Sequence, residues 1–142
     1  MSTCQITPEV LDALKQFRFR KSKSNAALVF RIDVKSLAVI LDGLHENIKL
    51  EDLSEELPEN TPRFMVLSYE LKLEDDRVSY PLVGIFYCPE GSNDTNRMLY
   101  ASTEAQLFQQ ASISGKVLEL HDAEDLTDEW LTQLLIASKT RK

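Results

Sequence analysis

The sequence predicts a single domain of the mixed α/β class, in which one central sheet carries helices on both faces. Its 142 residues are enough for one domain with a hydrophobic core of its own. Helical and strand periodicities alternate along the chain, which is typical of helices packed on a sheet. Two pairs of strands are joined by turns, whereas a third connection contains a helix. We therefore expect a mixed sheet of about five strands or more.

The predicted elements are runs of apolar periodicity bounded by capping residues, turns or prolines. In chain order they are a helix at residues 7–21, strands at 26–34 and 37–42, a helix at 50–58, strands at 63–73 and 77–88, a helix at 94–112, a strand at 116–121 and a helix at 123–138. Residues 43–47 are expected to form a loop. The two ends, residues 1–6 and 139–142, are expected to be flexible.

Capping residues and prolines support these helix bounds. Thr7 can cap the first helix, and Pro8 suits its first position, where a backbone N–H would have no partner. Pro58 ends the second helix because proline cannot donate to the helical ladder. Asn93 and Asp94 both offer capping oxygens to the long helix. The helices should therefore begin and end close to these residues.

The expected core consists of apolar residues that recur at helical or strand spacing. Its predicted members are Val10, Leu14, Phe17, Leu50, Leu53, Leu57, Phe64, Val66, Leu82, Phe86, Leu126, Trp130, Leu131, Leu134 and Leu135. Pro81 lies inside the strand predicted at 77–88, and it suits an edge or a bulge because it has no N–H to give to a sheet.

The long helix at 94–112 has two apolar stripes where one would be enough to join a core. The first stripe contains Leu99, Tyr100, Thr103, Leu107 and Ala111. The second contains Met98, Ala101, Ala105 and Phe108, with Ser102 and Gln109 at its edge. One interpretation of the second stripe is a helix buried on both sides. The other is a surface that docks into a partner protein, with Met98 and Phe108 as its anchors.

Composition excludes several function classes. The net charge of −7 argues against nucleic acid and anionic membrane as partners, since both need clustered basic residues. The basic residues 18–21 suit the C-terminal end of the first helix, and a small positive patch for an acidic partner is the alternative. No apolar run is long enough to span a membrane, and the first residues do not have the pattern of a secretory signal. Cys4 and Cys88 do not suggest a disulfide framework, so we expect a reduced, cytosolic protein.

The sequence has no recognisable catalytic or metal-binding motif. His45 and His121 each lie outside any metal-ligand or nucleophile pattern, and four glycines leave no phosphate-binding loop. Adjacent carboxylates at 55–56 and 75–76 suit solvated surfaces. We therefore expect a binding domain that is not an enzyme and needs no cofactor or metal. A small enzyme with an unrecognised site is the remaining alternative.

Six segments resemble a known family in the order in which that family carries them. The chain resembles the actin-depolymerising-factor homology (ADF-H) family and, more narrowly, the glia maturation factors. The matching segments are FRFRK (17–21), NAALVFRID (25–33), ELPENTPRF (56–64), DDRVSYPL (75–82), RMLYAS (97–102) and AEDLTDEWL (123–131). They are spread over nearly the whole chain, so the resemblance implies a single ADF-H domain.

The resemblance implies binding to the actin-related protein 2/3 complex, with inhibition of branched actin nucleation and promotion of debranching. It also implies little or no direct binding of actin, a monomer, and a cytoplasmic location on cortical actin patches or at the leading edge. The implied main surface contains Ser2, Thr3, Arg20, Lys21, Arg97, Met98, Ala101, Ser102, Ala105, Phe108, Asp122, Glu124 and Asp125. A second surface contains Asp75, Asp76, Arg77 and Glu129. Ser2 is an implied phosphorylation site.

Two departures separate the chain from cofilins. Thr95 stands where cofilins carry a basic residue, and the turn at 74–77 is acidic where cofilins grip the filament with basic residues. Carboxylates would be repelled by an acidic filament surface. The glycine that some relatives carry before the turn arginine is also absent, since Asp76 precedes Arg77 here. A cofilin-like protein that severs filaments is the alternative function.

Overall fold

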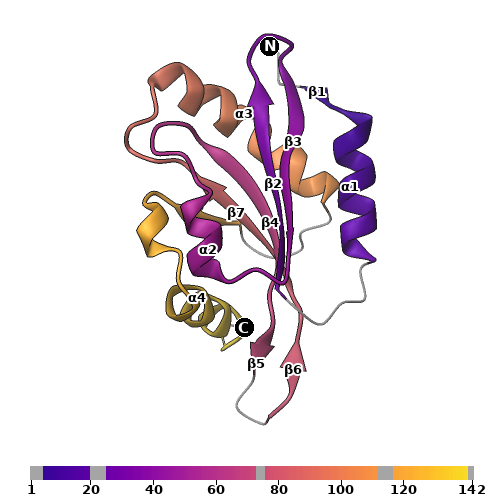
Figure 1. Ribbon diagram of the computed structural model, residues 1–142, viewed down its shortest axis with the longest axis vertical. Coiled ribbons are helices and arrows are strands. Elements are labelled where there is room, and N and C mark those ends of the chain that lie inside the picture. The colour runs from indigo at the N-terminus through magenta and orange to yellow at the C-terminus, as the bar shows by residue number, and fades with distance from the viewer. Residues whose placement is uncertain (1–4, 20–24, 73–75, 112–116, 141–142) are drawn as a thin grey trace.

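The computed structural model describes residues 5–19, 25–72, 76–111 and 117–140, with side chains up to residue 135. Within these residues the centre of the molecule is a six-stranded sheet with the strand order β1-β3-β2-β4-β7-β8 (Figure 1). The strands are β1 Gln5–Ile6, β2 Ala26–Asp33, β3 Ala38–Glu46, β4 Arg63–Ser68, β7 Leu82–Tyr87 and β8 Leu118–Leu120.

The sheet is antiparallel in its centre and parallel at both edges. β2, β3, β4 and β7 pair antiparallel, whereas β1 pairs parallel with β3 and β8 pairs parallel with β7. The parallel pair β7/β8 is connected through α3 (Asp94–Gln110), as a parallel connection requires. The expectation of a mixed sheet is therefore confirmed.

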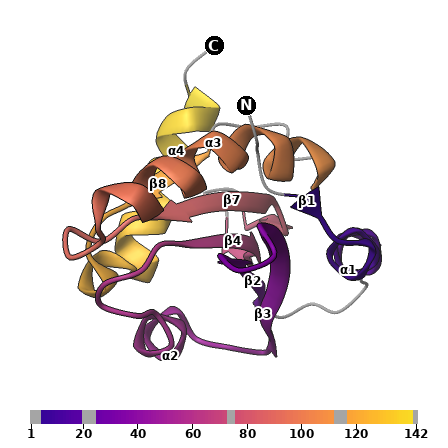
Figure 2. The same cartoon turned by 90° about the horizontal axis from the view of Figure 1, so that it is seen from above.

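Helices cover both faces of the sheet, as predicted (Figure 2). α1 (Pro8–Arg18) and α3 share one apolar core with the sheet. α2 (Leu50–Glu55), the 3-10 turn η1 (Ala123–Asp125) and α4 (Asp128–Thr140) flank the other face, whose core takes in residues of α2 and α4. Because side chains alternate along a strand, Leu28 and Phe30 of β2 enter the first core while Ala27 and Val29 enter the second.

The start of α1 confirms the predicted cap. The Thr7 hydroxyl accepts a hydrogen bond from the Val10 N–H at 3.4 Å and donates one to the Val39 carbonyl at 3.0 Å, which links α1 to β3. Pro8 takes the first helical position. Gln5 and Ile6, expected within a flexible end, form β1 instead.

β3 is longer than predicted, and the expected loop at 43–47 is mostly strand. Gly43 pairs with Val29, and the pairing continues as far as Glu46 opposite Ala26. A register shift between Val29 and Phe30 leaves Asp42 as the extra residue of a bulge. Pairing with β2 outweighs the weak strand propensity of this segment.

The predicted hairpin of 63–73 and 77–88 is confirmed, but each of its strands is interrupted. β4 and β7 belong to the central sheet, whereas β5 (Leu71–Lys72) and β6 (Val78–Ser79) form a small separate sheet that projects beyond it (Figure 1). Pro81 lies at one interruption, as its missing N–H suggests. Its carbonyl accepts from the Tyr69 N–H at 3.2 Å.

The last helix begins later than predicted, because the segment from 123 first forms η1 and only then α4. Leu126 and Leu131 are buried as expected, and Trp130 and Leu135 are partly buried. Leu134 is 37% exposed, so its assignment to the core was wrong. The backbone of α4 extends to Thr140, into the segment that was expected to be flexible.

Candidate partner-binding surface

α3 is fixed on the sheet by its first apolar stripe. The Asn93 side chain caps the helix by accepting from the Asn96 N–H at 2.8 Å. Tyr100, Thr103 and Leu107 are buried beneath the helix, as predicted. The Tyr100 hydroxyl accepts from the Ile32 N–H of β2 at 2.9 Å, and burial raises the pKa of this tyrosine. The helix is therefore held in one rotation about its own axis.

Phe108 belongs to the core, and its prediction as a docking anchor was wrong. Its side chain is only 3% exposed, and its ring packs edge-on against Phe64 with 5.9 Å between ring centroids. Gly84 of β7 provides the space, because a Cβ at that position would lie 2.9 Å from Cδ1 of Phe108. The other members of the second stripe are not buried with it.

The rest of the second stripe is an exposed ridge along α3. Met98 is 73% exposed, and Ala101, Ser102 and Ala105 are exposed as well, at spacings of three and four residues that share a helix face. The interpretation of a helix buried on both sides is therefore wrong. The large side chain of Met98 gives a partner one anchor. The small side chains of the alanines let the partner approach the helix closely. We call Arg97, Met98, Ala101, Ser102 and Ala105 the α3 ridge.

Arg97, at the start of the ridge, is also exposed. One of its guanidinium nitrogens donates to the Glu90 carbonyl at 2.6 Å, which holds the side chain over the loop before α3. The Ser102 hydroxyl donates to the Leu99 carbonyl at 2.8 Å. The polar members of the ridge therefore have defined positions before any partner arrives.

The acidic residues of the predicted main surface lie at the same end of the sheet as the start of α3. β7 and β8 are parallel, so their C-terminal ends lie side by side at one end of the sheet. There β7 leads to α3 and β8 leads to η1. The Cys88 N–H donates to the Leu120 carbonyl at 2.8 Å, and Nδ1 of His121 lies 3.0 Å from the Cys88 carbonyl oxygen. Asp122, the next residue, caps η1 by accepting from the Glu124 N–H at 3.0 Å.

A shallow hollow connects the two predicted surfaces. It has a volume of about 260 Å³, and its described lining residues are Glu124, Asp125, Thr127, Glu129, Trp130 and Gln133. Glu124 and Asp125 belong to the predicted main surface, and Glu129 to the second. Thr127 and Gln133 were not predicted from the sequence, and Trp130 was assigned to the core alone. Helical spacing on α4 from Glu129 to Gln133 was a signal for Gln133, whereas Thr127 precedes the helix and had no such signal.

The second predicted surface lies on the projecting hairpin and on α4. Asp76 and Arg77 are exposed, and Asp76 has a φ of 67°, the left-handed conformation that aspartate tolerates better than most residues do. The turn therefore reaches this geometry without a glycine. At the base of the hairpin the Tyr69 hydroxyl donates to Asp128 of α4 at 2.7 Å. Burial raises the pKa of Tyr69, so that it keeps the proton it donates.

Five predicted site residues lie outside the described residues: Ser2, Thr3, Arg20, Lys21 and Asp75. Among the residues that are described, no group of three or more histidine, cysteine or acidic side chains could hold a metal ion. Nor does this part of the chain contain a helix that is long and apolar enough to cross a membrane. Burial raises the pKa of the Cys88 thiol, which lowers its reactivity at neutral pH.

Comparison with known proteins agrees with this architecture. Residues 3–135 match the family of cofilin/tropomyosin-type actin-binding proteins. A solved structure of actin depolymerization factor 2 from Plasmodium berghei has a TM-score of 0.81 at 17% identity, with 96% of this chain and 99% of that one covered, which shows the shared fold. The chain therefore belongs to the cofilin/ADF family and has the ADF-H fold.

Within that family the chain is similar in sequence to glia maturation factors. Human glia maturation factor beta is 42% identical over 132 residues, which cover 93% of this chain and 92% of that protein. The Drosophila melanogaster glia maturation factor is 39% identical over 90% of this chain and 92% of its own length. The solution structure of the Caenorhabditis elegans glia maturation factor has a TM-score of 0.81 at 37% identity, covering 94% of this chain and 96% of that one. The chain is thus a member of the glia maturation factor family and an actin-regulating protein.

Proposed function

We propose that this protein binds the actin-related protein 2/3 complex, inhibits the nucleation of actin branches and promotes the dissociation of existing ones. Membership of the glia maturation factor family supports the choice of partner. The observation that carries the proposal is the α3 ridge, where Met98 stands 73% exposed on a helix whose other face is fixed in the core. The protein would act by binding alone, with no covalent chemistry.

The main surface would enter the barbed-end groove of an actin-related subunit. Met98 would fill an apolar pocket, while Ala101 and Ala105 let the helix approach closely, as amphipathic helices do in hydrophobic grooves. Arg97 and the acidic residues that begin at Asp122 would contact the polar rim of the interface, where charges contribute more to specificity than to affinity. The first subunit of the daughter filament needs the same groove, so the two would compete.

The second surface would help to separate the branch from its mother filament. Asp76 and Arg77 on the projecting hairpin and Glu129 on α4 would touch a neighbouring subunit at the junction. A ligand shifts an equilibrium only through a difference in its affinity for the two states. When both surfaces are in contact, the protein would therefore have to bind the detached state more tightly than the branched state.

The protein would bind actin filaments poorly. Thr95 and Asp76 stand where cofilin-like filament contact would call for basic residues, and Asp76 is exposed. Phosphorylation of Ser2 would add negative charge beside the main surface and would weaken binding. We propose a cytoplasmic location on the branched actin cytoskeleton.

The test is to image preformed fluorescent actin branches with wild-type protein and with Met98→Ala. We expect the wild type to remove branches and the variant to do so roughly tenfold more slowly, the effect of losing about 1.4 kcal/mol of binding at one anchor. Val34→Ala is the matched control, because Val34 is also an exposed apolar residue and lies in the turn after β2. It should debranch like the wild type.

The remaining outcomes decide between the alternatives. Equal debranching by wild type and Met98→Ala would show that the ridge is not the docking surface. Severing of unbranched filaments, together with co-sedimentation with them, would favour the cofilin-like function that the shared fold also allows. No effect on branches would overturn the proposed function.

A further inference from the structure

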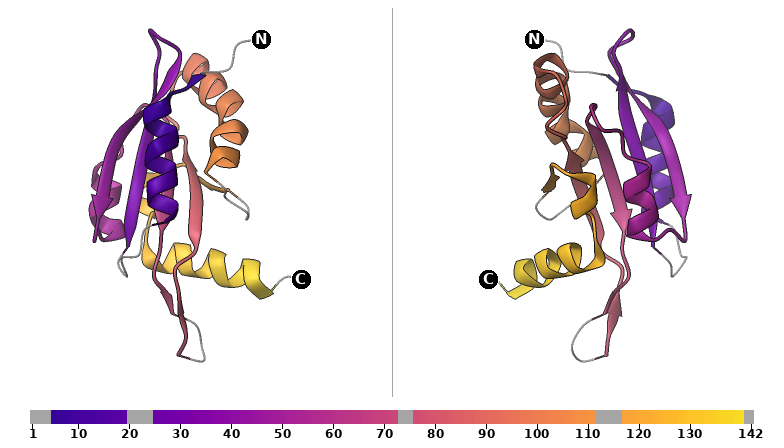
Figure 3. Two further views of the ribbon diagram at one scale, coloured as in Figure 1. Left: turned by 90° about the vertical axis from the view of Figure 1, so that its right-hand side faces the viewer. Right: turned by 60° about the vertical axis from the view of Figure 1, so that its left-hand side comes forward.

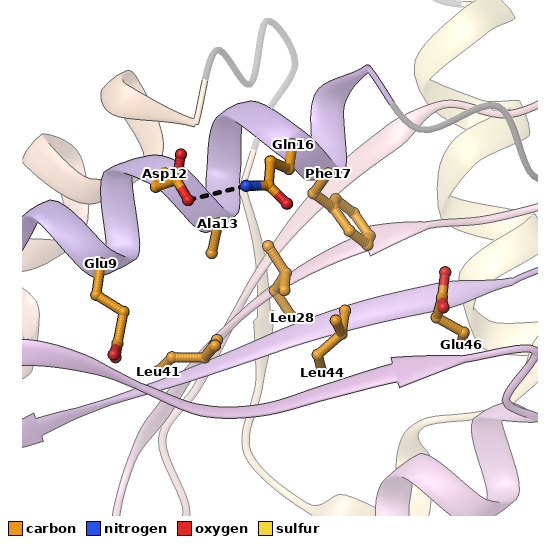
Figure 4. Close-up of a pocket in the computed structure, with 9 residues that line it drawn as sticks. All are labelled: Glu9, Asp12, Ala13, Gln16, Phe17, Leu28, Leu41, Leu44 and Glu46. Atoms are coloured by element: carbon orange, nitrogen blue, oxygen red, sulfur yellow. Dashed lines mark hydrogen bonds between the residues drawn. The ribbon is translucent and has the colours of Figure 1, made fainter.

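A groove lies between α1 and the edge of the sheet, and neither the α3 ridge nor the projecting hairpin contributes to its described lining. It has a volume of about 480 Å³ (Figure 4). Leu28 and Leu44 rise from the strands toward α1, and Ala13 and Phe17 line the groove from the helix. Leu44 is 54% exposed although its neighbour on the floor, Leu28, is buried. A large apolar side chain is thus left in solvent at the mouth of the groove.

The charged residues in the described lining of this groove are all acidic. Of the described residues that line it, Glu9 and Asp12 lie on α1 and Glu46 lies at the end of β3, and none of the others carries a charge. Glu9 lies in the first turn of α1, where the helix dipole stabilises the ionised carboxylate. Figure 4 shows Glu9 extending from α1 toward the strands. The α1 wall of the groove therefore presents negative charge.

The form of the occupant follows from the edge strand. β1 pairs with β3 only at Ala38 and Val39, so no other described strand covers the outer edge of β3 beyond them. The bulge at Asp42 interrupts that edge, and bulges prevent an added strand from pairing. Addition of a peptide strand is therefore unfavourable, and a helix laid into the groove is the better fit.

We propose that the α1–β3 groove binds a basic amphipathic helix of a partner protein. Aliphatic side chains on one face of that helix would pack on Leu41 and Leu44, which lie beside the buried Leu28. Lysines or arginines that flank this face would reach Glu9 and Asp12 on α1. The site lies apart from α3, so it would let the protein hold a second partner while the α3 ridge is occupied.

The test uses a synthetic probe. It is a fluorescent peptide about 15 residues long, near the length at which an isolated helix becomes marginally stable, with leucines at helical spacing and flanking lysines and arginines. We expect the peptide to bind by fluorescence anisotropy, to gain helicity on binding, and to bind more weakly as salt is raised. A peptide of the same composition in scrambled order should bind at least tenfold more weakly.

The matched variants are Leu44→Lys and Val34→Lys, which add the same charge at residues that are 54% and 55% exposed. Because both side chains are in solvent, both variants should fold. Leu44→Lys should weaken peptide binding at least tenfold, and Val34→Lys should change it less than twofold. Equal weakening by both would show that the peptide responds to net charge only, and would overturn the proposal.

Three further results would also overturn it. Equal binding of the ordered and scrambled peptides would exclude a helix as the occupant. Binding without a gain in helicity would exclude it too. A dimer that forms in sedimentation experiments and is abolished by Leu44→Lys would identify a second copy of this chain as the occupant. All of these readouts are independent of branch dissociation, so the proposed function can fail while this site stands.

Discussion

The inner and outer faces of α3 differ in what lies opposite them, although both carry apolar residues. On the inner face, Phe108 fills a space that Gly84 leaves open in β7. On the outer face, Met98 is 73% exposed. The comparison shows that the role of an apolar residue on a helix depends on the element it faces as much as on its own hydrophobicity.

The sharpest way to break this comparison is to truncate one residue on each face. Phe108→Ala should lower the free energy of unfolding by about 3–5 kcal/mol, because it leaves a cavity against Phe64. Met98→Ala should change it by no more than about 0.5 kcal/mol, as is usual for exposed side chains. Urea unfolding followed by circular dichroism measures both. Similar losses for the two variants would contradict the assignment of faces.

Gly84→Ala tests the space itself. The new Cβ would come within 2.9 Å of the Phe108 ring, so the ring or the helix must shift. We expect a loss of about 1–3 kcal/mol in unfolding free energy, the range found for overpacked cores. The double variant Gly84→Ala/Phe108→Ala should lose less than the sum of the two single losses, because the clash disappears with the ring. Additive losses would show that the two residues do not interact.

Tyr100→Phe removes one hydrogen bond from the inner face and keeps the ring. The Ile32 N–H would lose its acceptor at 2.9 Å, which should reduce the unfolding free energy by about 1–2 kcal/mol. Hydrogen exchange at the Ile32 amide should become faster than in the wild type. Unchanged exchange at that amide would mean that the hydroxyl is not its partner in solution.

Glu104→Gln concerns the side of α3 between the two faces and should have the smallest effect. Burial, with a smaller contribution from Glu119, raises the pKa of the Glu104 carboxyl. A raised folded-state pKa means that stability falls as pH rises from the unfolded-state value to the folded-state value. The stability of the variant relative to the wild type should therefore be slightly higher at pH 7 than at pH 4. Thermal unfolding of both proteins at both pH values measures this difference. A variant that is relatively more stable at pH 4 than at pH 7 would contradict the raised pKa of Glu104.

Local signals account for most of what the sequence predicted correctly. Thr7 and Asn93 cap helices through bonds to the residue three positions on, and Pro8 begins one without any bond of its own, which a sequence displays directly. The alternation of β2, whose side chains are divided between the two cores, and the spacing of Leu50 and Leu53 on α2 are likewise local patterns. These features can be predicted from the sequence because they do not depend on which other element packs against them.

The errors concern contacts between distant segments. Gly43 is part of β3 because Val29 pairs with it, and a glycine beside polar residues otherwise suggests a loop. Phe108 is buried because Gly84, many residues earlier, leaves room for it. The α1–β3 groove also joins segments that are far apart in the chain. No local pattern marks such places, so only the folded chain reveals them.

The hydrogen bond between Tyr69 and Asp128 has a mechanical consequence. Tyr69 directly follows β4, and the strand resumes at β5 two residues later, so the projecting hairpin is attached to the sheet at this point. Asp128 begins α4, and Tyr69 holds it at 2.7 Å. Figure 3 shows the hairpin and α4 leaving the sheet at the same end. Tension applied to the hairpin would therefore be transmitted to the start of α4, so that the hairpin and this helix would move together.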